Sequence, residues 1–263
     1  MRVFRLLMIP LLALVGVLAF AVPAQAAAGK YVALGDSYSS GTGAGSYGSS
    51  GACKRSANSY PQRWANAMAP SAFTFAACSG ARTGDILNAQ VNSVTADTAL
   101  VTISIGGNDA GFADVMITCN TSSDSTCVSR NNTAQNYARN TLPGQLDTVY
   151  RAIDARAPSA RVIVVGYPRM YRLGGGCVLG LSDTKRAAIN ASADVLAQVT
   201  AARAAAFGFD FLDARNAFSG HEICATRPYW LHSINLGAVD ESYHPTATGQ
   251  GSGYYPALRA ITG

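Results

Sequence analysis

The fold of this chain is decided near its start, where an apolar run passes directly into a polar turn: Tyr31-Val32-Ala33-Leu34-Gly35-Asp36-Ser37-Tyr38-Ser39-Ser40-Gly41. Residues 31–34 predict a buried strand, and the Gly-Asp-Ser triplet predicts the turn that ends it. Ser37 would then lie where a strand presents a hydroxyl to a ligand. A hydroxyl is a poor nucleophile until a base removes its proton, so this interpretation requires a histidine.

Short apolar runs like this one alternate with longer alanine-rich segments along the rest of the chain. The predicted strands are 31–34, 73–77, 100–105, 162–165 and 209–212, and the predicted helices are 60–68, 111–118, 133–155 with a break or kink at Pro143, 184–206 and 246–261. Continuous apolar strands interleaved with helices are typical of a parallel sheet covered on both faces. We therefore predict an α/β fold, a three-layer α/β/α sandwich around a five-stranded parallel sheet.

The first 26 residues have the composition of an export signal. Two arginines precede an apolar run over 6–22, and Ala24-Gln25-Ala26 supplies a small-residue cleavage site. This pattern favours a cleaved signal peptide over a membrane anchor, because the run is short for a bilayer span. The protein is expected to be secreted and to begin near Ala27, with residues 27–263 forming a single domain.

The charge of the chain excludes some partners. The formal net charge is +5, and it falls to +3 when the two arginines of residues 1–26 are removed. Because the chain has no dense cluster of lysine and arginine, no nucleic-acid partner is expected. We expect no cofactor, and a monomer is the default expectation.

The chain contains six cysteines: Cys53, Cys78, Cys119, Cys127, Cys177 and Cys224. An even number in an exported chain predicts three disulfides, but the sequence does not choose among the fifteen pairings that six cysteines allow. Zinc is the competing interpretation. No Cys-x-x-Cys occurs, and the mixed pair His221 and Cys224 has no second pair at ligand spacing, so no metal site is expected.

Each of the first three predicted strands ends in a polar turn that contains glycine: 35–37, 78–81 and 105–109. The carboxyl ends of parallel strands lie along one edge of a sheet, so these turns are expected to face one another. Glycine lets backbone N–H groups approach a ligand closely, and an asparagine amide adds an uncharged donor. Acyl transfer requires such donors around the oxygen that becomes negative.

Three histidines are available as the base: His221, His232 and His244. His244 is favoured because Pro245 and Thr246 mark the start of the last predicted helix, which places His244 on the loop before it. Nothing comparable fixes the direction of the other two side chains.

These residues resemble the sequence blocks of the GDSL, or SGNH, hydrolases, which have a flavodoxin-like sheet. The matching blocks occur in the family's order: Gly35-Asp36-Ser37-Tyr38-Ser39, Ser79-Gly80, Gly106-Gly107-Asn108-Asp109 and His244-Pro245. The resemblance is greatest to the secreted actinobacterial lipases and phospholipases A1. It implies that Ser37 is the nucleophile, that His244 is the general base, and that the Ser37 N–H, the Gly80 N–H and the Asn108 side chain form the oxyanion hole.

The resemblance also implies a sequential disulfide pairing, Cys53–Cys78, Cys119–Cys127 and Cys177–Cys224. One position departs from the family pattern, which commonly has aspartate three residues before the histidine. Here that residue is Glu241, and Asp240 precedes it. Three groups remain open as the partner that orients His244: the Ser242 backbone carbonyl, Glu241 and Asp240.

The function that follows is a secreted serine ester hydrolase acting on acyl esters of lipids, as a lipase, phospholipase A1 or esterase. Its partner would be a lipid or small ester, met at a membrane or micelle interface. A carbohydrate acetylesterase is the alternative, and a non-catalytic secreted binding protein is the alternative of another class. A lipid requires an apolar channel. Two interpretations stay open for seven apolar residues, which either line such a channel or belong to the ordinary core: Phe112, Met116, Met170, Tyr171, Leu173, Val178 and Leu179.

Overall fold

The central sheet consists of five parallel strands in the order β2-β1-β3-β4-β5. The computed structural model describes residues 29–174, 177, 180–225 and 228–263, so the predicted signal peptide and the start at Ala27 lie outside the described residues. The strands are β1 (Lys30–Gly35), β2 (Phe73–Phe75), β3 (Thr98–Ser104), β4 (Arg161–Val165) and β5 (Asp210–Leu212). The predicted α/β architecture is confirmed.

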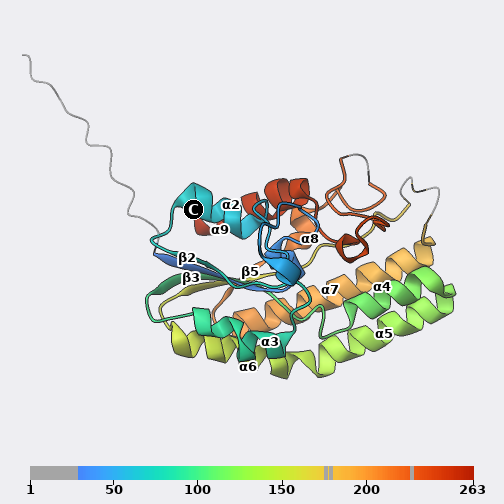
Figure 1. Cartoon of the computed structure of the whole chain (residues 1–263). Coiled ribbons are helices and arrows are strands. Elements are labelled where there is room, and N and C mark those ends of the chain that lie inside the picture. Colours follow the sequence, from blue (N-terminus) through green and yellow to red (C-terminus); the bar gives the residue numbers. More distant parts are fainter. Residues whose placement is uncertain (1–28, 175–176, 178–179, 226–227) are drawn as a thin grey trace, which may run out of the picture.

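Helices cover both faces of this sheet (Figure 1). One face carries α2 (Tyr60–Met68), α8 (Ala214–Ala217) and α9 (Tyr255–Thr262), and the other carries α3 (Thr83–Asn88), α4 (Phe112–Thr121), α5 (Asp124–Asn140), α6 (Leu142–Arg156) and α7 (Asp183–Ala206). The central strands are buried on both sides, and Val32 and Ile103 have no exposed surface. Their continuous apolar sequences therefore fit the middle layer of three.

The ends of β1 and β3 lie side by side. The strands pair in register from Tyr31 with Leu100 to Gly35 with Ser104. Gly35 has a φ of +126°, and a Cβ there would lie 2.5 Å from the Ser104 carbonyl oxygen, so this close approach requires glycine. Because β1 pairs with β2 on one side and β3 on the other, this edge is the topological switch point where parallel sheets bind ligands.

The predicted helix over 133–155 is two helices. α5 begins earlier, at Asp124, because the Ser123 side chain caps it by accepting the Thr126 N–H. Pro143 lies in the first turn of α6, where a missing N–H costs nothing, so it begins a helix instead of bending one.

Other boundaries differ less from the prediction. The last predicted helix opens with a π-helical segment, Gly249–Tyr254, before α9. Strand β2 ends at Phe75, two residues earlier than predicted, because the Ala76 and Ala77 N–H groups both bond to the Ala33 carbonyl and leave the ladder. The short segments α3, α8, Gly51–Cys53, Gln90–Ser93 and Val239–Glu241 have no periodic apolar signal in the sequence.

Three disulfides join the cysteines in the pairing that the resemblance implies: Cys53–Cys78, Cys119–Cys127 and Cys177–Cys224. Over the described part of the chain, no helix has the length and apolar character needed to cross a membrane. Within the same residues, no three His, Cys, Asp or Glu side chains are grouped as metal ligands would be.

Candidate active site

Ser37 and His244 meet at the switch point, although they are 207 positions apart in the chain. The Ser37 Oγ lies 2.7 Å from the His244 Nε2. Ser37 is the first residue of the short helix α1 (Ser37–Ser40), which follows β1 directly and is capped by Asp36. The structure thus places the two residues predicted as nucleophile and base at hydrogen-bonding distance.

The partner of the other imidazole nitrogen is a backbone carbonyl. His244 Nδ1 lies 3.0 Å from the Ser242 carbonyl oxygen, and a carbonyl only accepts, so Nδ1 carries the proton and Nε2 is left as the acceptor facing Ser37. Part of the residue is accessible to solvent, but burial of the ring lowers the pKa of His244 to about 4. The imidazole is therefore neutral, and able to accept a proton, at neutral pH.

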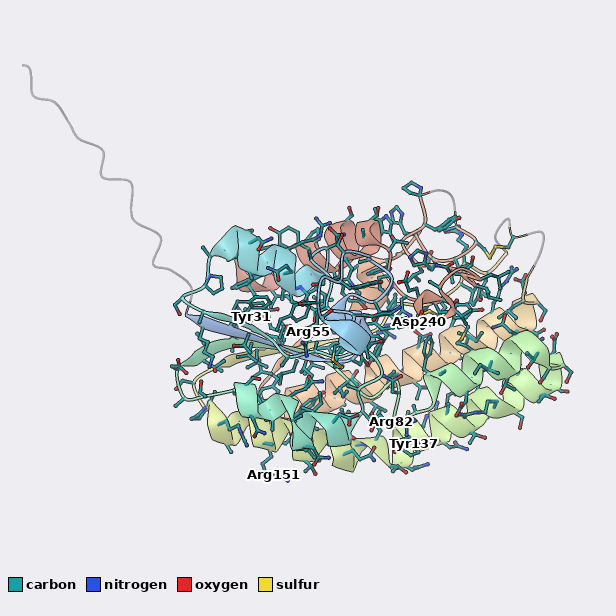
Figure 2. The ribbon with its side chains drawn as sticks, in the orientation of Figure 1. Tyr31, Arg55, Arg82, Tyr137, Arg151 and Asp240 are labelled. Carbon is teal, nitrogen blue, oxygen red and sulfur yellow. A yellow bond between two sulfur atoms is a disulfide. The ribbon has the colours of Figure 1, made fainter. Side chains whose placement is uncertain are left out.

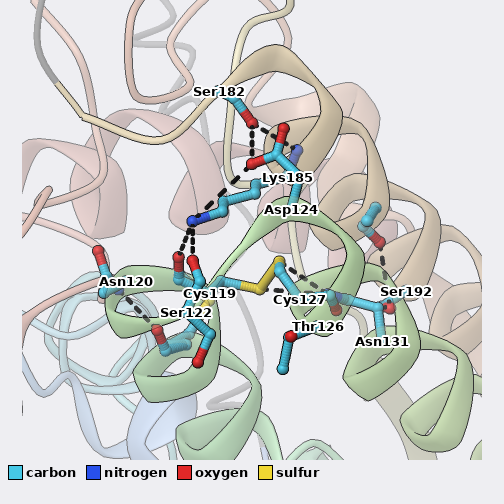
Figure 3. The surroundings of a disulfide bond; sticks show 12 residues. Cys119, Asn120, Ser122, Asp124, Thr126, Cys127, Asn131, Ser182, Lys185 and Ser192 are labelled. Carbon is cyan, nitrogen blue, oxygen red and sulfur yellow. Dashed lines mark hydrogen bonds and ion pairs between the residues drawn. A yellow bond between two sulfur atoms is a disulfide. The ribbon is translucent and has the colours of Figure 1, made fainter.

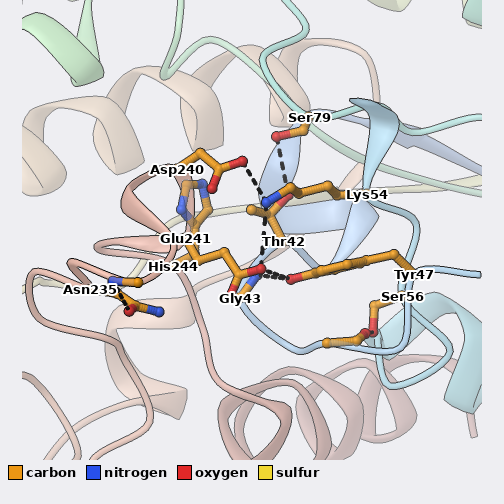
Figure 4. A network of polar contacts seen from close by, with 12 residues as sticks. Thr42, Gly43, Tyr47, Lys54, Ser56, Ser79, Asn235, Asp240, Glu241 and His244 are labelled. Carbon is orange, nitrogen blue, oxygen red and sulfur yellow. Dashed lines mark hydrogen bonds and ion pairs between the residues drawn. The ribbon is translucent and has the colours of Figure 1, made fainter. Parts of the chain in front are cut away.

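The two carboxylates considered for this role have other partners (Figure 4). Glu241 accepts a hydrogen bond of 2.8 Å from the Tyr47 hydroxyl and lies 3.4 Å from the Lys54 ammonium, and Asp240 lies 2.5 Å from the same ammonium. Lys54 holds the pKa of Asp240 below its usual range. These contacts tie the 41–58 loop to the loop that carries His244, and no bond joins either carboxylate to the imidazole.

The remaining histidines have structural contacts. His232 Nε2 lies 2.7 Å from the Gly43 carbonyl oxygen. The His221 ring stacks on Trp230 at 3.6 Å between ring centres, and its Nδ1 lies 2.9 Å from the Pro228 carbonyl oxygen.

Three hydrogen-bond donors predicted for the oxyanion hole come from the three strand-end turns. Among the described residues, the N–H groups of Ser37 and Gly80 have no hydrogen-bond acceptor, whereas their neighbours Ser79 and Ala81 do. Gly80 has a φ of +81°, a left-handed conformation that favours glycine. The Asn108 amide donates one hydrogen to the Ala81 carbonyl at 3.0 Å, which fixes its orientation and leaves the second hydrogen for a ligand.

An apolar pocket opens beside Ser37 and runs between α4, α5 and α7. Its cavity volume is about 70 Å³, so the pocket is narrow. Its lining includes Ser37, Asn108, Phe112, Val115, Ala134, Ala138, Met170, Ile189 and Leu196.

Of the residues predicted to line an apolar channel, Phe112 and Met170 line this pocket. Met116 and Tyr171 belong to the buried core, the alternative left open for them, and Leu173 is half exposed to solvent and is not part of the pocket lining. Val178 and Leu179 lie outside the described residues.

A buried polar cluster lies beneath Ser37 and was not predicted in full. Asp36 accepts hydrogen bonds from the Tyr167 hydroxyl at 2.5 Å and the Ser104 hydroxyl at 2.7 Å. Burial raises the pKa of Asp36 to about 6, although these bonds favour its ionised form. Asp36 accepts the Tyr38 N–H in α1 and Asp109 accepts the Thr83 N–H in α3, so both carboxylates support the start of a helix.

Tyr38 is a further residue of the site that sequence reasoning missed. Its hydroxyl donates a 2.7 Å hydrogen bond to the Tyr243 carbonyl, next to His244, and its ring centre lies 5.3 Å from that of the imidazole. Tyr243 has a φ of +64°, which is unusual for a bulky residue. The only signal in the sequence is the position of Tyr38 directly after Ser37, and it does not reveal the partner.

This geometry agrees with the comparisons with known proteins. The sequence profile of the GDSL-like lipase/acylhydrolase family matches residues 33–251. The chain belongs to this family. As a member of the GDSL-like family it is a carboxylic ester hydrolase, as the sequence predicted.

Streptomyces relatives support the same membership. A lipase of Streptomyces rimosus is 57% identical over 258 residues, which cover 98% of this chain and 96% of the relative. Lipase 1 of Streptomyces coelicolor is 60% identical over 234 residues, which cover 89% of this chain and 87% of the relative.

Two solved GDSL-like structures extend the similarity to the fold. The phospholipase A1 of Streptomyces albidoflavus NA297 superposes with a TM-score of 0.87 at 54% identity, over 89% of this chain and 99% of that one. The extracellular lipase of Streptomyces rimosus also gives 0.87, at 58% identity, over 89% and 100%.

Proposed function

We propose that this chain is a secreted lipid acyl-ester hydrolase, of the lipase or phospholipase A1 type, in which Ser37 forms an acyl-enzyme and His244 is the general base. One observation carries the proposal: the 2.7 Å contact between Ser37 Oγ and His244 Nε2 lies at the mouth of an apolar pocket. A non-catalytic binding protein would have no need of this contact.

In the first half of the reaction, His244 Nε2 takes the hydroxyl proton as Ser37 Oγ attacks the ester carbonyl carbon. The bond from Nδ1–H to the Ser242 carbonyl orients the imidazole and supports its charged form, so the pair works as a dyad without a carboxylate. The N–H groups of Ser37 and Gly80 and the Asn108 amide would stabilise the developing oxyanion.

As the tetrahedral intermediate collapses, His244 gives this proton to the leaving alcohol, and the acyl-enzyme remains on Ser37. In the second half, His244 removes a proton from the attacking water and returns it to Ser37 Oγ as the carboxylic acid is released. The pocket between α5 and α7 would hold the acyl chain, because its apolar lining begins at Ser37 and Asn108. An acetyl group would leave this pocket empty, so the pocket favours a longer acyl chain over the acetyl group of a carbohydrate ester.

Secretion is part of the proposal. It is supported by the signal-like composition of residues 1–26, by the three disulfides, which persist in oxidising compartments, and by the similarity to an extracellular lipase. We propose that the exported protein is residues 27–263, a single hydrolase domain.

The test is an activity profile of purified protein on esters from acetyl to long acyl, with phosphatidylcholine alongside. We expect kcat/KM to rise beyond acetyl and to fall by roughly 10³-fold or more in His244→Gln at every chain length. Activity confined to acetyl esters, or an active His244→Gln, would contradict the proposal.

A further inference from the structure

A second hollow lies on the other side of the Gly80 turn, along the edge strand β2. It is an open groove lined by Cys53, Arg55, Thr74, Phe75, Ala76, Cys78, Ser79, Gly80, Ala81, Asp85, Ala89, Gln90 and Ser93. One hydrogen bond joins the walls of the two hollows, since Asn108 lines the acyl pocket and its partner Ala81 lines the groove. An ester whose carbonyl oxygen lies between Asn108 and Gly80 therefore has a hollow on each side.

Arg55 lines this groove and is held in place by backbone carbonyls. Its Nε donates to the Ala77 carbonyl at 2.8 Å, and one Nη donates to the Ala76 carbonyl at 3.4 Å. The disulfide between Cys53 and Cys78 fixes the Arg55 segment against the same turn.

The charge of Arg55 is not paired with a carboxylate anywhere in the described residues. The one carboxylate in the groove lining, Asp85, accepts the Arg82 N–H at 2.8 Å. A guanidinium group has five N–H donors in a planar fork, and the two carbonyls accept from only two of them. A fixed cation with unused donors is suited to an anion, and arginine binds phosphate in particular.

We propose that this groove binds the alcohol part of the substrate and that Arg55 binds the phosphate of a glycerophospholipid. This inference rests on the proposed function and names its substrate class. Ala77 is three residues from Gly80, at most about 10 Å of extended chain. In a glycerophospholipid only a few bonds separate the phosphate from the ester that is cleaved, so one molecule spans Gly80 and Arg55.

The experiment compares phosphatidylcholine with a diacylglycerol of the same acyl chains, both in the same detergent micelles. In Arg55→Gln we expect kcat/KM for phosphatidylcholine to fall by roughly 10- to 100-fold, the value of a charge-assisted hydrogen bond, with no change for diacylglycerol. Arg55→Lys, which keeps the charge, is expected to recover part of the loss. The matched control is Arg151→Gln, an exposed arginine of α6 that does not line the groove and lies apart from Arg55 (Figure 2), and it should change activity on neither substrate.

The possible results distinguish phosphate binding by Arg55 from a purely structural role of this residue. An equal loss on both substrates would show that Arg55 only holds its loop, and it would overturn the phosphate site. No loss on either, or a wild-type protein active on diacylglycerol alone, would overturn it as well, while the proposed ester hydrolysis would stand. A wild-type protein inactive on both lipids would instead overturn the proposed function on which the site rests.

Discussion

At the scale of single residues, the site is organised around the imidazole of His244. The Ser242 carbonyl is its Nδ1 partner, and the neighbouring carboxylates Asp240 and Glu241 are engaged by Lys54. The sequence brought out Ser37 and His244 because each lies beside a recognisable strand end or helix start. The sequence did not identify the group that orients His244, because every residue has a backbone carbonyl and because three adjacent residues, 240–242, all offer an acceptor.

The dyad predicts that neither carboxylate is needed for chemistry. Glu241→Gln and Asp240→Asn should each keep kcat on a soluble ester within about 10-fold of wild type, because the Nδ1 bond to the carbonyl survives in both. Steady-state kinetics of the two variants at neutral pH measure this. A loss near 10⁴-fold in one of them would identify a true catalytic acid.

At the scale of elements, the acyl pocket depends on how α4, α5 and α7 are joined (Figure 3). The Cys119–Cys127 disulfide links α4 to α5, and Asn131 on α5 donates to the Cys127 carbonyl at 2.9 Å. Ser192 on α7 then donates to Asn131 at 2.7 Å. Small side chains of α5, Ala134 and Ala138, leave the space between these helices open.

Filling this space should shorten the preferred acyl chain. Ala134→Leu places a larger side chain in the pocket, so we expect kcat/KM for a long-chain ester to fall by about 10-fold or more, with the acetyl ester little changed. Thr133→Leu, exposed and one residue earlier on α5, is the matched control and should leave the ratio of the two substrates unchanged. Parallel losses on both esters in Ala134→Leu would argue against an acyl chain in this pocket.

Some helices were predicted accurately from the sequence, and the helix that lines the pocket was not. The helix 60–68 is confirmed with its bounds, because Ser59 caps it and its apolar side is regular. The predicted helix 133–155 contains the wall residues Ala134 and Ala138, but their place in the pocket was not predicted. The first half of α5 was missed because α5 is rich in asparagine and carries only small buried residues, so its buried face has no apolar period to detect.

At the scale of the whole molecule, two buried groups of the site make opposite contributions to stability. The folded-state pKa of Asp36 is raised to about 6, so its contribution is present below about pH 4 and lost as pH rises through 6. The folded-state pKa of His244 is lowered to about 4, so its contribution is present above about pH 6.5 and lost as pH falls through 4. The two contributions to stability oppose each other between about pH 4 and pH 6.5.

Single variants should therefore separate the two opposing pH dependences of stability. In His244→Gln we expect the free energy of unfolding to fall by about 3 kcal/mol between pH 4 and pH 6.5, which is the Asp36 contribution alone. In Asp36→Asn it should rise over the same range. Urea unfolding at several pH values measures both, and profiles parallel to the wild type would contradict the two pKa shifts.

The overall architecture was the part most completely predicted, because the central strands are buried on both faces and four of the five strands leave nearly continuous apolar runs in the sequence. These apolar runs do not determine the order of the strands in the sheet. This order follows from crossovers such as the one from β2 to β3, which passes β1, leaves β2 at the edge and opens the switch point where Ser37 and Asn108 lie.

The proposed role of Ser37 as nucleophile can be tested by covalent labelling. Wild-type protein is incubated with a serine-reactive phosphonate ester and digested, and the modified peptide is identified by mass spectrometry, with Ser37→Ala in parallel. We expect one adduct per chain, on Ser37, with loss of esterase activity in step with labelling and neither labelling nor activity in Ser37→Ala. No adduct on Ser37, or full esterase activity in Ser37→Ala, would contradict it.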